Sequence, residues 1–193
     1  MIKRAHLGAV LIFVMGCAFM GKGLWIGGKA VVAQILLEKA WDQSVKTSEP
    51  TVPWAWMDAY PMAKITIPSL GRSTIVLSTA SGQALAFGPA HMQQTPKPGQ
   101  SGTAIIAAHK NTHFDFLKDV RTGDIIEVQM ADNTRLRFEV SKAEIVHKDR
   151  SGIPAHETLD APKRLALVTC YPFDAISFGG PMRYIITADL INT

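Results

Sequence analysis

The part of the chain from Met62 onward is a series of short apolar segments, and this series constrains the fold more than any other feature. Apolar and polar residues alternate in AKITIPSL, which is the period of a half-buried strand, and a Leu-Gly-Arg turn leads into STIVL. Five further segments have strand character, namely TAIIAAH, DIIEVQM, TRLRFEVSKAEIVH, RLALVTC and RYIITADL. Six or seven closely spaced strands with little helix between them predict a mainly β domain, built as a closed or nearly closed barrel or as a sandwich.

Turn-forming residues separate these segments. Ala131-Asp132-Asn133 lies between DIIEVQM and TRLRFEV and predicts a tight hairpin. A short helical piece is expected around residues 82–87, and two longer connections rich in proline and glycine cover residues 88–102 and 171–182. If the domain is a barrel, the ends of strands that are distant in sequence meet at one rim.

The first 28 residues are of a different kind. Lys3 and Arg4 precede an uncharged stretch over residues 7–21, and after Lys22 the apolar character continues to Gly28. This pattern predicts one membrane anchor of about 20 residues over positions 7–27, with Lys22 reaching toward the headgroups and Trp25 at the interface. Because basic residues favour the cytosolic side, the pattern predicts a single-pass inner-membrane protein whose following domain is extracytoplasmic.

Two other interpretations of this segment stay open. A cleaved signal peptide suits the length of the apolar stretch, although its best small-residue exit, Val31-Val32-Ala33, lies far downstream. A lipoprotein signal at Cys17 fits less well, because a strongly apolar stretch follows the cysteine. With the anchor, the predicted domains are the anchor over 1–28, a juxtamembrane helix and proline-rich linker over 29–61, and the β domain over 62–193.

The excess positive charge lies in the N-terminal segment. Residues 1–48 carry six basic and two acidic side chains, whereas residues 49–193 carry fourteen of each kind. The basic segment fits the surface of a membrane that contains anionic lipids. Since the remainder has no cationic footprint, the composition excludes a polynucleotide as the partner.

Cys170 is a cysteine at the end of an apolar strand. The only other cysteine, Cys17, lies inside the apolar N-terminal segment, where it cannot bridge to an exported domain. A thiol that stays unpaired in an oxidising compartment is a candidate nucleophile, although core packing is the common alternative. Arg183 opens the last strand thirteen residues later. It could clamp a carbonyl or an oxyanion, or form a surface ion pair with Asp174 or Asp189.

A nucleophilic thiol needs an acid/base partner, and the chain has six histidines. His109 closes the apolar segment TAIIAAH, so it stands where a buried strand gives way to a loop. His113 is close enough in sequence to be a rival, and His91 is a further candidate. Taken alone, any one of these histidines is more commonly structural.

Taken together, the three residues resemble the site of a sortase, one of the membrane-anchored cysteine transpeptidases of bacteria. The matching pieces are LAFGPAHMQQTPKPGQSGTAIIAAHKNTHFDFLKDVRTGDIIEV around His109, LALVTC ending on Cys170, and RY at Arg183. They cover residues 63–190 in the order of the family, and YPFDAISFGGPMRY further resembles the Gram-negative (proteobacterial) subgroup. Sortases commonly have Gly-His-Arg where this chain has Ala108-His109-Lys110, and Lys110 keeps the positive charge.

The resemblance implies a closed β-barrel of about 7–8 strands with short helices, preceded by one N-terminal transmembrane helix. It implies that Cys170 is the nucleophile, His109 the acid/base and Arg183 the clamp on the substrate carbonyl or oxyanion. Substrate binding is expected from four residues beside these, Thr169, Tyr171, Pro172 and Ala108. No cofactor is implied, and no metal is expected, because the acidic Ca²⁺ pocket of one sortase class has no counterpart here.

The expected activity is cleavage of the C-terminal sorting signal of a secreted protein through a thioester, followed by transfer of the acyl group to an amine acceptor at the cell envelope. Membrane lipid is the expected partner of the N-terminal helix. The loops over 88–102 and 171–182 are expected to select the peptide, since loops on a rigid scaffold commonly carry recognition. Two alternatives stay open, a cysteine peptidase that only hydrolyses and a membrane-tethered β-barrel that binds without catalysis.

Overall fold

The computed structural model describes residues 2–150, 152–153, 160–175 and 179–191, and at 2–12, 18 and 23–27 it describes the backbone alone. The chain divides into two compact units, Met1–Leu36 and Leu37–Thr193. Helix α1 (Ile2–Thr47) begins in the first unit and ends in the second. Among the described residues, no helix is both long and apolar enough to cross a membrane. The side chains at 7–12, 18 and 23–27 of the predicted anchor lie outside the described part, so the anchor and the domain limits stay predictions.

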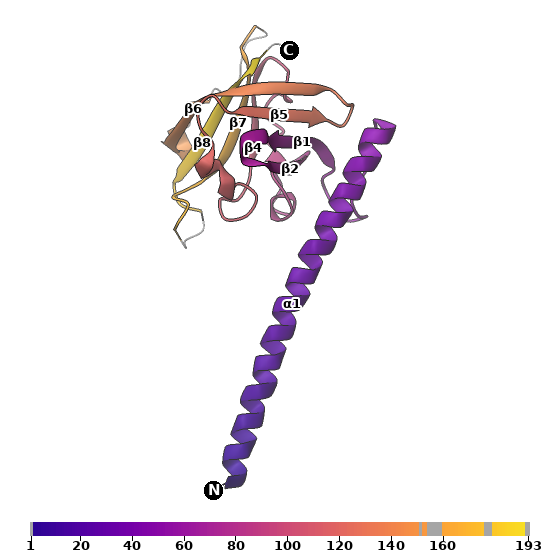
Figure 1. Cartoon of the computed structure of the whole chain (residues 1–193), viewed down its shortest axis with the longest axis vertical. Helices are drawn as coiled ribbons and strands as arrows, with labels where there is room; N and C mark the ends of the chain where they lie inside the picture. The colour runs from indigo at the N-terminus through magenta and orange to yellow at the C-terminus, as the bar shows by residue number, and fades with distance from the viewer. Residues whose placement is uncertain (1, 151, 154–159, 176–178, 192–193) are drawn as a thin grey trace. The chain divides into compact units, whose positions relative to one another are not determined.

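The described part of the second unit contains a β-barrel (Figure 1). The barrel is closed, and its eight strands follow one another in the order β1-β2-β3-β4-β7-β8-β6-β5. The strands are β1 (Pro61–Ile67), β2 (Arg72–Leu77), β3 (Ala90–His91), β4 (Gly102–Ala107), β5 (Ile125–Met130), β6 (Arg135–His147), β7 (Lys163–Tyr171) and β8 (Met182–Ile191). Short 3₁₀ helices lie between them, at η1 (Pro68–Leu70), η2 (Ala84–Ala86), η3 (Asp115–Asp119) and η4 (Lys148–Arg150). The prediction of a closed, mainly β barrel with short helices is confirmed, and the sandwich is wrong.

The turn predictions are confirmed, with one difference in a strand end. Met130 N–H donates to Thr134 O at 2.8 Å and Asn133 takes a φ of 66°, so the predicted hairpin joins β5 to β6. The first strand is shorter than AKITIPSL, because it ends at Ile67 and Pro68 begins η1. A proline has no N–H to donate to a ladder, which explains the difference.

Two strand pairs position the strand ends on which the candidate residues lie. β4 and β7 are parallel and in register from Gly102 opposite Lys163 to Ala107 opposite Val168. β7 and β8 are antiparallel, from Arg164 opposite Asp189 to Tyr171 opposite Met182. The C-terminal ends of β4 and β7 and the N-terminal end of β8 therefore meet at one rim of the barrel.

Alternate residues of these strands fill the barrel. The core contains Ala104 and Ile106 of β4, Leu165 and Leu167 of β7, and Ile186 and Ala188 of β8. Because successive side chains of a strand point to opposite faces, the residues between them belong to the outer face. The residues that alternate with the core residues are therefore the ones whose side chains a ligand on the outer surface can contact.

A second apolar cluster lies in the same unit, apart from the barrel core. Its buried members are Leu37, Met57, Ala59, Leu77, Ala84 and Ala90. The Trp54 ring packs edge-on against Phe87, with 4.9 Å between ring centroids. Ser44 of α1 accepts a hydrogen bond from the Thr51 N–H at 3.0 Å. The proline-rich segment before β1 is therefore packed onto its own unit through Met57 and Trp54.

Candidate active site

Cys170 and Arg183 face each other across neighbouring strands. Cys170 is the last residue but one of β7 and Arg183 is the second residue of β8, and the antiparallel ladder pairs them directly. Directly opposed residues of such a pair project to the same face, with Cβ atoms about 4.5–5.5 Å apart. The thiol and the guanidinium therefore start from adjacent positions, and both residues are half-buried.

His109 lies at the same rim, on the other side of β7. β4 ends with Ala107 paired to Val168, and the Ala108 N–H extends the pairing by donating to Val168 O at 3.1 Å. The strand ends at Ala107, two residues before His109 where the segment TAIIAAH was expected to end, and continuing its register by two residues would bring His109 next to Cys170. His109 is exposed, as a group that exchanges protons with a substrate needs to be.

The three residues belong to the outer face of the barrel. Each of them lies three positions from a core residue of its own segment, and these core residues are Ile106, Leu167 and Ile186. By strand alternation an odd separation reverses the direction of the side chain, so all three point away from the core. The rim therefore presents a thiol, an imidazole and a guanidinium to the outer surface, and their roles as nucleophile, proton carrier and clamp remain predictions.

Thr169 and Ala108, both predicted to bind substrate, are bonded to each other. Thr169 is 2% exposed and its hydroxyl donates to the Ala108 carbonyl at 2.8 Å, while Ala108 is 7% exposed. This bond joins the residue before Cys170 to the residue before His109. Contacts of either residue with substrate remain predictions, and the observed bond holds the two segments together.

Lys110 makes a second link between the same two segments, after Cys170 and His109 in sequence, where the Thr169–Ala108 bond lies before them. Its side chain is buried, and Nζ donates to the carbonyl oxygens of Pro172 and Ala175, both at 2.6 Å. An ammonium that is removed from water needs acceptors of this kind. Sequence reasoning noted the charge of Lys110 but missed these contacts; the available signal was a basic residue directly after a strand-end histidine.

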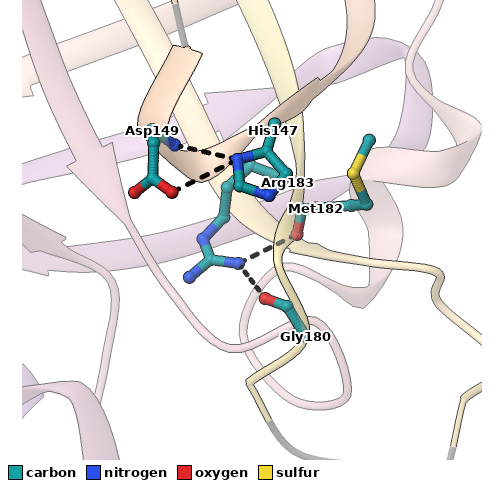
Figure 2. A network of polar contacts seen from close by, with 5 residues as sticks. All are labelled: His147, Asp149, Gly180, Met182 and Arg183. Atoms are coloured by element: carbon teal, nitrogen blue, oxygen red, sulfur yellow. Dashed lines mark hydrogen bonds and ion pairs between the residues drawn. The ribbon is translucent and has the colours of Figure 1, made fainter.

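The Arg183 side chain is held by the loop that precedes it. Nη1 donates to the carbonyl oxygens of Gly180 at 2.6 Å and Met182 at 2.9 Å (Figure 2). Asp189, considered above as an ion-pair partner, instead accepts a hydrogen bond from Arg164 Nε at 2.9 Å. A guanidinium carries its five N–H donors in one plane, so bonds at Nη1 also orient the remaining donors.

Residues 65–191 match the Sortase domain family. The chain belongs to the sortase family. Sortases are cysteine transpeptidases that act on sorting signals, and the family assignment therefore makes this chain a cysteine transpeptidase. No curated protein sequence matches this one.

Solved sortase structures share the fold of this sortase. The Clostridium perfringens sortase D5 transpeptidase superposes with a TM-score of 0.64 at 23% identity, over 84% of this chain and 99% of that one. Corynebacterium diphtheriae sortase A gives 0.62 at 18% identity, over 84% and 86%. Clostridium perfringens sortase C with the C-terminal cell wall sorting motif gives 0.60 at 16%, over 86% and 90%. At these identities the likeness is one of fold.

The rival histidines of this sortase lie in other surroundings. His91 of β3 is 4% exposed, with Nε2 at 2.9 Å from Pro96 O, and burial lowers its pKa. Burial is also the main cause that lowers the pKa of His113, and the nearby His109 lowers it further. Neither residue continues β4 beside Cys170, so the geometry favours His109 as the acid/base.

Of the other predicted substrate-binding residues of this sortase, Tyr171 is the last residue of β7 and Pro172 begins the β7–β8 loop. The Tyr171 ring lies 6.5 Å from the Tyr184 ring in a stacked arrangement and 6.3 Å from the Phe173 ring edge-on. Phe173 and Tyr184 in turn pack against the barrel core. Pro172 is exposed, whereas Tyr171 is half-buried, so Pro172 is the more open to a ligand. Binding by either residue remains a prediction.

His147, another of the six histidines, borders the same loop. It ends β6 opposite Met182, and its Nδ1 lies 3.4 Å from Asp149 Oδ2 (Figure 2). The Lys148 N–H donates to Pro181 O at 2.8 Å, which ties the end of β6 to the loop. His147, Asp149 and Arg150 line an open depression of about 390 Å³.

No group of three or more His, Cys, Asp or Glu side chains placed to hold a metal ion occurs among the residues that the structure describes. The absence of a metal stays an expectation. Residues 176–178, within the loop predicted to select the peptide, lie outside the described residues.

Proposed function

We propose that this sortase is a membrane-anchored transpeptidase that cleaves the C-terminal sorting signal of a secreted protein and transfers the acyl group to an amine acceptor at the cell envelope. The observation that supports this most is the ladder position of Cys170 opposite Arg183, with His109 two residues beyond the end of the neighbouring strand β4. A peptide laid over the outer face of the barrel at this rim meets all three side chains.

The first half-reaction cleaves the peptide. The Cys170 thiolate attacks the carbonyl carbon of a Thr-Gly-like bond, forming a C–S bond while an electron pair moves onto the carbonyl oxygen. As the tetrahedral intermediate collapses, the C–N bond breaks and His109 gives its proton to the leaving amine. The acyl group then remains on Cys170 as a thioester.

The second half-reaction releases the product. The acceptor amine attacks the thioester carbon, His109 takes the proton that the amine loses, and the C–S bond breaks to return the thiolate. Water in place of the amine gives hydrolysis, which is the peptidase alternative. The chemistry of the two outcomes is the same up to the thioester.

Arg183 is proposed to hydrogen-bond the substrate carbonyl oxygen and the oxyanion that forms from it. A preorganised cation contributes most where negative charge develops during the reaction. The bonds from Nη1 to Gly180 O and Met182 O support this role, because they restrain a long side chain before substrate arrives.

The N-terminal helix is proposed to anchor the enzyme in the inner membrane, with the barrel on the extracytoplasmic side, as in the Gram-negative subgroup that YPFDAISFGGPMRY resembles. Exposed apolar side chains on α1 support lipid contact, since Phe13, Phe19 and Met20 are 72%, 70% and 70% exposed. The full chain should remain in membranes washed with carbonate, and protease added to spheroplasts should reach the barrel. Recovery of the full-length chain in the soluble fraction would contradict the anchor.

Product analysis tests the proposed activity. The purified full chain is mixed with a library of peptides that contain Thr-Gly-like bonds, with and without a glycine-based amine, and the products are weighed by mass spectrometry. A peptide joined to the amine indicates transpeptidation, and the free acid alone indicates the peptidase. Both products should disappear in Cys170→Ala and persist in Cys17→Ala. If no peptide is cleaved and Cys170 resists alkylation in the folded protein, the non-catalytic alternative is correct.

A further inference from the structure

Lys110 is a buried cation that bonds only to main-chain oxygens among the contacts described for it. The residue is 8% exposed, and its Nζ lies 2.6 Å from Pro172 O and 2.6 Å from Ala175 O. Hydrogen bonds from an ammonium are charge-assisted and therefore stronger than those between neutral groups. The lysine thus holds the first residues of the β7–β8 loop against the end of β4.

The two links around the candidate residues have a common pattern. Thr169 and Ala108, which come directly before Cys170 and His109, are joined by the buried 2.8 Å hydrogen bond. Lys110 comes directly after His109, and Pro172 comes two residues after Cys170. Cys170 and His109 are therefore held from both sides by bonds between the same two segments.

We propose that Lys110 is a positioning residue, which sets the placement of His109 relative to Cys170 and holds residues 171–175 in the shape that receives the sorting signal. The inference rests on the proposed function. Lys110 is turned toward the loop carbonyls and acts through His109 and Cys170, so it is not itself a group that reacts.

The chemistry of Lys110 separates positioning from mere stability. A buried ammonium costs desolvation free energy, and removing Lys110 also leaves the Pro172 and Ala175 carbonyl oxygens without their donor, so some loss of stability is expected in either case. A lysine kept for stability alone should lose unfolding free energy but keep kcat when it is replaced by Met, whereas a positioning residue should also lose kcat.

The test compares three variants of the full chain. Lys110→Met removes the donors and keeps the length, Lys110→Arg restores donors at the position where sortases commonly have arginine, and Lys118→Met changes an exposed lysine of η3 as the matched control. For each variant we measure kcat and KM in the peptide and amine assay, the thermal unfolding midpoint, and the rate of Cys170 alkylation by iodoacetamide as a function of pH.

Lys110→Met should lower kcat by about 10- to 100-fold, since an error of about 1 Å in placement can cost about 100-fold in rate. Its unfolding midpoint should fall modestly, because two main-chain oxygens lose their donor, but the protein should stay folded at the assay temperature. The pH profile of Cys170 alkylation should shift because the neighbouring imidazole has moved. Lys110→Arg should recover most of kcat, and Lys118→Met should leave all three measurements unchanged.

A Lys110→Met protein that is folded, keeps kcat within twofold and shows an unshifted alkylation profile would overturn the proposal. If Lys110→Met does not fold, Lys110→Gln replaces it in the same three measurements. Glutamine keeps N–H donors but has no charge, and its side chain is shorter than that of lysine. If the wild type makes no product with any peptide, the transpeptidase proposal fails by itself. The alkylation profile then still decides on Lys110, since it needs no substrate.

Discussion

The two loops predicted to select the peptide differ in which residues supply the hydrogen bonds that stabilise them. The β3–β4 loop is stabilised mainly by its own residues and by the strands that it joins. His91 Nε2 lies 2.9 Å from Pro96 O, and the Thr95 hydroxyl donates to Met92 O at 2.8 Å. The same hydroxyl accepts a hydrogen bond from the Ile105 N–H at 3.1 Å, and the Lys97 N–H donates to Gln100 Oε1 at 2.8 Å.

The described part of the β7–β8 loop is held by residues that border the candidate site. Lys110 donates to its first residues, at Pro172 and Ala175. Arg183 donates to Gly180 near its other end, and the Lys148 N–H donates to Pro181 O. Two of these three donors are immediate neighbours of His109 or are themselves assigned to the reaction.

This difference has a consequence for specificity and catalysis. A loop bonded within itself keeps its shape when a residue of the site changes, so its effect on peptide choice should be separable from the chemistry. The β7–β8 loop shares its donors with the site. Changes that alter the loop should therefore also alter kcat, and changes at the site should alter the loop.

Arg183→Gln should give the largest effect and tests this coupling most directly. Loss of a preorganised donor to an oxyanion costs about 100- to 1,000-fold in kcat. Because the side chain also bonds Gly180 and Met182, hydrogen exchange of the β7–β8 loop should become faster while the β3–β4 loop is unchanged. Steady-state kinetics and peptide-resolved hydrogen exchange provide the two measurements.

Arg164→Gln is the matched control, at the opposite end of the same strand pair. Its partner is Asp189 at 2.9 Å, and both side chains are almost half exposed, at 44% and 45%. Exposed ion pairs contribute about 0.2–1 kcal/mol, so stability should fall slightly and kcat should not change. Equal losses of kcat in the two arginine variants would contradict the assignment of Arg183.

A matched pair of threonine variants should give intermediate effects. Thr169→Val and Thr95→Val each remove a hydroxyl that bonds main chain. Thr169→Val should cost about 1–3 kcal/mol of unfolding free energy, because the buried Ala108 carbonyl loses its donor, and Thr95→Val about 0.5–1.5 kcal/mol, because its bond to Met92 O is exposed. Only Thr169→Val should also lower kcat, by about 10-fold, because its hydroxyl bonds the residue before His109. Denaturant unfolding and kinetics below the unfolding transition measure both. A loss of kcat in Thr95→Val of the same size would show that the β3–β4 loop is coupled to the site as well.

The smallest expected effect is a dependence of the unfolding midpoint on pH, and it arises from His91, next to the β3–β4 loop. Burial lowers the pKa of His91 relative to the unfolded chain, so the unfolded state takes up a proton first as the pH falls. The stability contribution of neutral His91 is therefore complete above the unfolded pKa and is lost as the pH falls toward the folded pKa. The unfolding midpoint should drop between about pH 7.5 and pH 5.5, and His91→Asn should weaken that dependence.

His113 contributes in the same direction as His91, because burial lowers its pKa too, so His91→Asn should reduce the dependence without removing it. A His91→Asn profile identical to that of the wild type would contradict the role given to burial.

Much of the barrel could be predicted because its signals are local. The alternation in AKITIPSL and RYIITADL predicts strands since side-chain direction has a period of two, and Asn133 predicts a hairpin since it tolerates positive φ. His109, Cys170 and Arg183 stand out for a similar reason, as reactive or charged residues at the ends of apolar runs. The contacts of Lys110 could not be predicted, because both acceptors are main-chain oxygens more than 60 positions away.

The sequence by itself thus determined the strands, the hairpin, the order of the candidate residues and, through its match to residues 65–191, the family. Tertiary structure alone decided that β4 lies beside β7, that Cys170 is opposite Arg183, and that Lys110 reaches Pro172. The physical reason is that period and turn preference act between residues close in the chain. Strand order and side-chain partners depend instead on which distant backbone groups satisfy one another when the barrel closes.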